Sequence, residues 1–84
     1  MPHDKSLEIS VITPDGLLFQ GKAHSVTFPG EKGVFEVLPQ HKPLLSRLIR
    51  GMIVIDSRAI AVRRGIVKLG LNKLIAIVET PQST

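Results

Sequence analysis

The sequence predicts an all-β domain, an antiparallel sandwich or barrel built from many short strands. Apolar residues make up 43% of the 84-residue chain, yet there are only three Phe and no Trp or Tyr, so Ile, Val and Leu supply most of the apolar mass. These aliphatic residues favour a pleated surface. Turn residues interrupt the apolar stretches every several positions, and no stretch keeps the 3.6-residue period of a helix.

The first two strands are expected to form a hairpin. Apolar and polar residues alternate over 7–11, and the turn residues of 13–16 come before the apolar residues 17–19. Alternation resumes over 22–28, which we interpret as one strand that stops at the breaker-rich loop 29–33.

The middle of the chain is expected to hold two further strands. Residues 34–38 form the first, and Pro39 ends it. Residues 44–49 form an apolar stretch that Ser46 and Arg47 interrupt, a spacing that fits either a strand or a single helical turn. We favour the strand.

Two hairpins are expected to complete the domain. Strands at 52–55 and 59–62 flank the turn residues 56–57, and strands at 66–69 and 74–79 flank a four-residue turn. The chain therefore predicts an N-terminal tail over 1–6, one domain over 7–79 and a polar tail over 80–84.

Two of the expected strands are too apolar for a sheet with one wet face. Residues 52–55 and 74–78 are apolar at nearly every position. A domain of this size can cover few strands on both sides, so we expect another protein to cover part of the surface. A tightly curled barrel with buried edges is the alternative.

The formal charge of +4 is compatible with nucleic acid, an anionic membrane or an acidic protein as partner. Without cysteine the chain has neither disulfides nor thiolate metal sites. It contains no apolar run of membrane-spanning length, and its N-terminus lacks the apolar stretch of a signal peptide. We therefore expect a soluble, cytoplasmic protein.

Residues for catalysis, cofactor binding or metal binding are sparse. The seven acidic residues are scattered, the three histidines lack metal-ligand spacing, and no phosphate-binding glycine motif is present. His24 shares the parity of Val26 and Phe28, so we expect a strand-end histidine bonded to a backbone carbonyl. We expect no enzyme activity, no cofactor and no metal.

A small basic β-barrel that binds nucleic acid is the alternative function. Such a barrel needs aromatic platforms for base stacking, and the chain has only three Phe. The basic residues that could form a stripe are Arg47, Arg50, Arg58, Arg63, Arg64 and Lys68.

Several motifs follow one another in a set order along nearly the whole chain. The motifs are Phe19-Gln20-Gly21, the Gly30 to Gly33 loop, Leu38-Pro39-Gln40-His41-Lys42-Pro43-Leu44-Leu45 and Gly51-Met52-Ile53-Val54-Ile55. This ordered series, which continues through 62–67 to 74–78, resembles the ε subunit of F-type ATP synthase. The resemblance implies a flattened antiparallel β-sandwich of about ten short strands that joins the γ subunit and the polar loops of the membrane c-ring.

The resemblance also implies a function and a contact site. The domain would be a non-catalytic rotor subunit at the cytoplasmic face of the bacterial inner membrane, touching the membrane only through the complex. The expected c-ring contacts are Glu31, Lys32, Gly33, Val34, Gln40, His41 and Lys42. At Glu36 the family commonly has Gly, and at Gln40 it often does. Longer members continue into a C-terminal helical hairpin, so the resemblance is to a short form without it.

Overall fold

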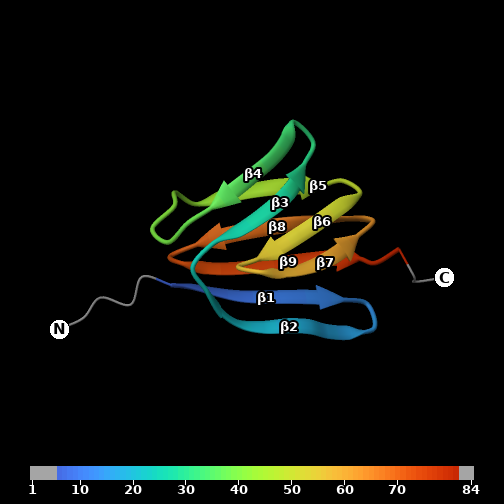
Figure 1. Ribbon diagram of the computed structural model, residues 1–84, viewed down its shortest axis with the longest axis horizontal. Coiled ribbons are helices and arrows are strands. Elements are labelled where there is room, and N and C mark those ends of the chain that lie inside the picture. The colour runs from blue at the N-terminus through green and yellow to red at the C-terminus, as the bar shows by residue number, and fades with distance from the viewer. Residues whose placement is uncertain (1–5, 82–84) are drawn as a thin grey trace.

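The computed structural model describes residues 6–81, and every regular element among them is a strand (Figure 1). Nine strands follow one another along the chain, joined by short turns and loops. They are β1 (Leu7–Thr13), β2 (Gly16–Ala23), β3 (Val26–Gly30), β4 (Gly33–Val37), β5 (Leu44–Leu48), β6 (Gly51–Ile55), β7 (Arg58–Val62), β8 (Arg64–Gly70) and β9 (Lys73–Glu79). The all-β prediction is confirmed, and residues 44–49 contribute a strand rather than a helical turn.

The strands form one sheet in the order β2-β1-β9-β8-β5-β3-β6-β7, and β4 pairs with β3. Every pair is antiparallel except β1 and β9, which run parallel from the Glu8–Lys73 pair to the Ile12–Ile77 pair. The sheet is therefore mixed and not purely antiparallel. No short turn joins β1 to β9, so hairpin geometry does not fix their relative direction.

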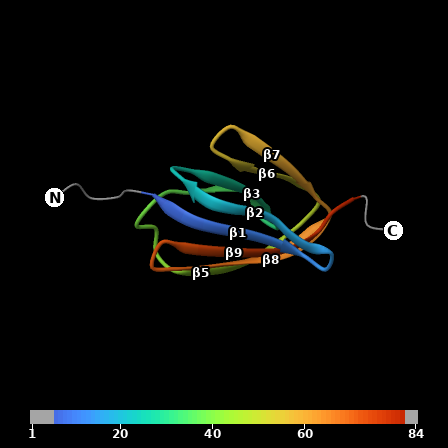
Figure 2. The same ribbon diagram turned by 90° about the horizontal axis from the view of Figure 1, so that it is seen from below.

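The sheet curls on itself between β5 and β3, where a single residue pair, Gly30 with Leu48, connects the two strands. On one side lies a major layer of β2, β1, β9, β8 and β5, and on the other a minor layer of β4, β3, β6 and β7. Figure 2 shows β6 and β7 across from β9, β8 and β5. The strands thus make a sandwich whose layers remain joined along one side.

Inward-facing aliphatic residues from both layers fill the core. Alternate residues of β1 and β9 are buried, as a strand with one wet face requires. The core residues are Leu7, Ile9, Val11, Ala23, Val26, Phe28, Val37, Leu48, Ile53, Ile55, Val62, Val67, Leu69, Leu74, Ala76 and Val78. The residues between these buried positions face outward and form the surface of the domain.

The expected single strand over 22–28 is wrong, because the chain breaks at His24 and Ser25 to pass from the major to the minor layer. The Asp56 carboxylate holds this break: its Oδ1 accepts hydrogen bonds from the backbone N–H of His24 (3.0 Å) and of Ser25 (3.1 Å). His24 lies at a strand end as expected, directly after β2, but its side chain is exposed and does not share the buried face of Val26 and Phe28.

The expected loop over 29–33 is shorter than its breakers suggest. Pro29 and Gly30 end β3, and β4 begins at Gly33, so Glu31 and Lys32 form a tight hairpin turn. Gly33 has a φ of 123°, which a glycine adopts without strain. The hairpin tip therefore projects as a defined element.

The side of the sandwich opposite the β5–β3 junction is bridged by side chains. Arg58 of β7 lies over the ring of Phe19 on β2, with its Cζ 5.5 Å from the ring centroid. These strands are the two ends of the strand order, so the cation–π contact links the outermost strand of each layer.

The first strand begins at Leu7 and the last ends at Glu79, and Ser6, Thr80 and Pro81 lie outside the strands. The other residues of the expected tails, 1–5 and 82–84, lie outside the described residues. Over 6–81 the chain holds no helix of the length and apolar character that crossing a membrane requires.

Candidate partner-binding surfaces

The outer face of the major layer carries a continuous apolar stripe. Register places Leu17 beside Ile12, Ile12 beside Ile77, and Ile77 beside Ile66, so the stripe crosses β2, β1, β9 and β8. These four side chains are 37–57% exposed. We call this surface the major face.

A second row of the major face is amphipathic. Ile75 lies between Ser10 and Lys68, and Lys68 also neighbours Leu45 on β5, the last strand of the major layer. Leu45 is 68% exposed. The major face thus combines an apolar stripe with flanking polar and basic groups, a composition typical of protein interfaces.

The outer face of the minor layer also carries exposed apolar side chains. Met52 and Val34 are 47% and 76% exposed, and an open groove between them is lined by Pro29, Val54 and Ile49. The prediction that both apolar strands leave surface uncovered is confirmed for the described residues. The two strands lie in different layers, so the uncovered surfaces face opposite directions.

The predicted contact residues Glu31, Lys32, Gly33 and Val34 all lie at the tip of the β3–β4 hairpin, and all four are exposed. Together with Leu45, Ser46, Arg47 and Ile66 they line an open groove of about 750 Å³. The hairpin tip therefore borders the major face on the β5 side.

The other predicted contact residues, Gln40, His41 and Lys42, are exposed in the loop between β4 and β5. The Gln40 backbone N–H donates to Oδ1 of Asn72 at 2.6 Å, and the His41 backbone N–H donates to the Leu38 carbonyl at 3.1 Å. His41 Nδ1 lies 2.6 Å from the Lys42 carbonyl oxygen. In the tautomer that carries its proton on Nδ1, the ring donates a hydrogen bond to this oxygen. This bond organises the turn and leaves Nε2 for other contacts.

The β8–β9 turn is a neighbour of this loop that the sequence analysis did not find. Asn72 ties the loop to the turn, and Leu71 at the turn is 96% exposed. Residues 70–73 are recognisable as a turn from the sequence. No sequence pattern shows that this turn holds Gln40, because Asn72 lies 32 positions further along the chain. We call the 38–43 loop together with Leu71 and Asn72 the Gln40 end.

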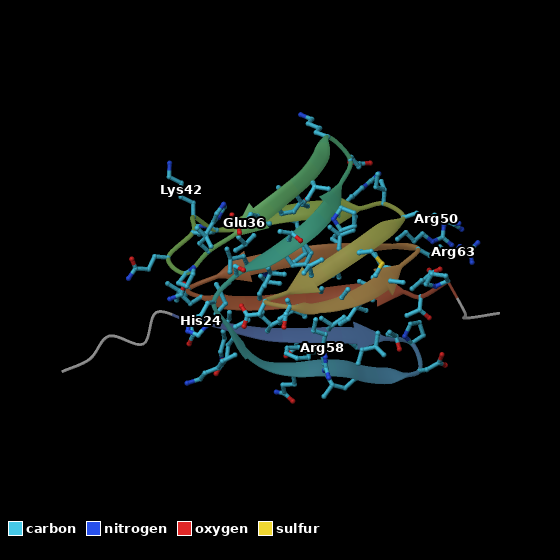
Figure 3. The ribbon with its side chains drawn as sticks, viewed as in Figure 1. His24, Glu36, Lys42, Arg50, Arg58 and Arg63 are labelled. Carbon is cyan, nitrogen blue, oxygen red and sulfur yellow. The ribbon has the colours of Figure 1, made fainter. Side chains whose placement is uncertain are left out.

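The structure does not bring the two groups of predicted contact residues together. They lie at opposite ends of β4, whose five residues span about 14 Å at about 3.4 Å per step. In Figure 3 Lys42 lies at one end of the sandwich, Arg50 and Arg63 lie at the other, and Glu36 lies on β4. A partner that touches both groups must run along β4.

Several charged residues have structural partners. Glu79 Oε1 accepts a hydrogen bond from Arg64 Nε at 3.1 Å, and Glu8 lies 3.9 Å from the Lys73 ammonium group. Residues 6–81 contain no group of three or more His, Asp or Glu that could hold a metal ion.

The expected basic stripe is only partly present. Arg47, Arg64 and Lys68 share the outer face of β5 and β8, and Arg64 is paired with Glu79. Arg58 lies over Phe19, and Arg50 and Arg63 lie in connections at one end. The three Phe offer no stacking platform, because Phe28 is buried against Phe35 with a centroid distance of 5.5 Å, and Phe19 lies under Arg58. This arrangement does not favour nucleic-acid binding.

Curated proteins from several organisms resemble this chain in sequence. The curated relatives include the "ATP synthase epsilon chain" of Nitratiruptor sp., 44% identical over 88% of this chain, and that of Sulfurimonas denitrificans, 36% identical over 87%. The chain spans 61% and 60% of the length of these two relatives.

Solved structures show the same fold. A chain from a cryo-EM structure of the central stalk and c-ring of Tetrahymena thermophila mitochondrial ATP synthase matches 87% of this chain with a TM-score of 0.75 and 14% identity, and the match covers 63% of that chain. A chain of the Euglena gracilis mitochondrial ATP synthase matches 93% with a TM-score of 0.80 and 13% identity, covering 53% of that chain.

The match to a family model extends over the whole described domain. The model, described as "ATP synthase, Delta/Epsilon chain, beta-sandwich domain", matches residues 6–82, which include all nine strands. The chain therefore belongs to the family of the β-sandwich domain of the ATP synthase delta/epsilon chain.

Proposed function

We propose that this chain is a non-catalytic subunit of the central stalk of an F-type ATP synthase, which couples rotation of the c-ring through γ to ATP synthesis. In this role the domain bears load between two partners and makes or breaks no bonds. The complex holds it at the cytoplasmic face of the bacterial inner membrane, and the bacterial relatives support that location.

The observation that carries the proposal is the apolar stripe of the major face. Leu17, Ile12, Ile77 and Ile66 form one continuous surface across four strands, and the described chain leaves it uncovered. Each of these side chains is already about half buried in the free domain, so a partner that covers it gains roughly half of the 1.5–3 kcal/mol for burying a fully exposed side chain. We assign γ to the major face, because its stripe carries exposed aliphatic side chains on four adjacent strands.

The polar loops of the c-ring are the second proposed partner, and we place them along the β4 side of the sandwich. This side carries both groups of predicted contact residues, with Glu36 between them. Contacts at exposed polar loops are individually weak, so the attachment is spread over the length of β4. Gln40 has a φ of 70°, which explains why the family often has glycine there.

Affinity purification of the tagged chain from cell membranes tests the proposal. We expect γ and c subunits to be recovered with it, and we expect an Ile66→Glu variant to recover much less γ because it places a charge in the apolar stripe. Recovery of RNA or DNA without γ and c subunits would refute the central-stalk role and favour the nucleic-acid alternative.

A further inference from the structure

Two residues at the Gln40 end have a backbone conformation that their side chains disfavour. Among residues 6–81, the non-glycine residues with positive φ are Gln40 (70°), Asp56 (52°), Leu71 (52°) and Asn72 (62°). Asp and Asn tolerate this left-handed region, whereas Gln and Leu do so poorly. Both poorly suited residues therefore lie at the same end, joined through the Gln40–Asn72 hydrogen bond.

Leu71 is unfavourable in two respects. Leu71 and Asn72 are the central residues of a two-residue hairpin turn in which both φ values are positive, a turn that strongly prefers Asn-Gly or similar pairs. Its side chain is also 96% exposed, the largest exposed fraction among the large hydrophobic residues of the described chain. Within the isolated domain this leucine therefore carries backbone strain without burial to offset it.

Strain of this kind persists mainly where function needs it. The Asn72 carboxamide fixes the position of the turn against the 38–43 loop, so Leu71 projects from a defined place beside Gln40. Because the backbone of the turn is already fixed, a partner that buries the Leu71 side chain has little backbone to order, which favours this residue as an interface anchor.

The surroundings of Leu71 indicate the chemistry of the partner. A shallow hollow of about 230 Å³ next to Leu71 is lined by Ser6, Glu8, Lys22, Asn72 and Lys73. Two Lys and one Glu line the hollow, so its side chains sum to a net positive charge. A partner surface that complements this end has an apolar hollow that takes the Leu71 side chain, and carboxylates or carbonyl oxygens border the hollow.

We propose that Leu71 is the apolar anchor of the Gln40 end and inserts into a hollow, bordered by acidic or carbonyl groups, on the polar loops of the c-ring. This inference rests on the proposed function and adds a residue outside the seven predicted contacts. A protein surface fits better than a lipid surface, because one leucine with a few partly neutralised lysines gives only weak membrane attachment.

The test measures how the complex of this chain with γ binds to purified c-rings in immobilised nanodiscs. The complex is prepared once with the wild-type chain and once with each Leu71 variant. Leu71→Gly removes both the side chain and the strain, so we expect the melting temperature of the isolated domain to rise by several degrees while the Kd for c-rings rises at least about tenfold. Leu71→Asn should act in the same direction. Leu71→Met keeps an apolar side chain and should stay within about threefold of the wild-type Kd.

Leu18→Asn is the matched control, because Leu18 is 44% exposed on β2, the strand farthest from β4 in the strand order, and has no positive φ. We expect it to leave the Kd for c-rings unchanged. A Leu71→Gly complex that binds c-rings within about twofold of wild type would overturn the anchor while leaving the central-stalk role intact.

Two other outcomes would also overturn the anchor. Wild-type complex that does not bind c-rings at all would refute the proposed c-ring contact and the anchor with it. Leu71-dependent binding of the isolated domain to vesicles containing anionic phospholipid, without any c-ring, would assign Leu71 to a lipid surface instead.

Discussion

Replacing Ile77 by glutamate is expected to weaken the affinity for γ at least about 100-fold and to leave the domain folded. Ile77 lies at the centre of the apolar stripe, between Ile12 and Ile66, and is 53% exposed. In the complex the change removes a buried aliphatic side chain and places an unpaired carboxylate against apolar groups, a combined loss of about 3 kcal/mol or more. Calorimetric titration with purified γ measures the affinity, and circular dichroism monitors the fold.

Met52→Glu is the matched control on the opposite outer face. Met52 is 47% exposed in β6 of the minor layer, so this variant introduces the same charge into a similarly exposed apolar position. We expect its affinity for γ to stay within about threefold of wild type, a difference of about 0.7 kcal/mol. The reverse result, in which Met52→Glu loses γ and Ile77→Glu retains it, would place γ on the minor layer and contradict the assignment of the major face.

Replacing Gly65 by alanine is expected to destabilise the domain by about 2–3 kcal/mol, a loss of about 10–20 °C in melting temperature. A Cβ at Gly65 would lie 2.5 Å from the Ile77 carbonyl oxygen and 2.8 Å from Val78 Cγ1. The closest atom belongs to the backbone of the adjacent strand, so relief requires β8 and β9 to move apart. Thermal and urea unfolding of the isolated domain measure the loss.

Gly70→Ala at the other end of β8 serves as the control. A Cβ there meets no atom within 4 Å, and Gly70 does not have a positive φ. We expect its stability to equal or slightly exceed that of wild type, since alanine reduces the entropy of the unfolded chain. Equal stability of the Gly65→Ala and wild-type domains would show that β8 and β9 are not packed as closely as the structure shows.

The sequence predicts the strands well because their signals are local. Alternation over 7–11 and the breakers at 13–16 specify β1 and its hairpin without reference to the rest of the chain. The excess of apolar residues in 74–78 likewise predicts an uncovered face, and register then shows that Ile77 is part of a stripe. Periodicity and turn chemistry suffice where neighbouring residues decide the structure.

The features that the sequence does not predict depend on distant contacts. The break at His24 and Ser25 is held by a carboxylate more than 30 positions away, and the parallel pairing of β1 with β9 joins the two ends of the domain. The resemblance places Glu31 and Gln40 in one contact end, whereas the hairpin geometry of β4 separates them. The anchoring of Gln40 by Asn72 is likewise a tertiary contact, so Leu71 could not be assigned to this site.

Ion-driven ATP synthesis tests the central claim most directly. The measurement uses the ATP synthase of the same organism, prepared without this chain and reconstituted into liposomes on which an ion gradient is imposed. We expect little synthesis from the depleted enzyme, restoration by the wild-type chain and much weaker restoration by Ile77→Glu at the same concentration. Full-rate synthesis by the depleted enzyme, or failure of the wild-type chain to restore it, would contradict a coupling role in the central stalk.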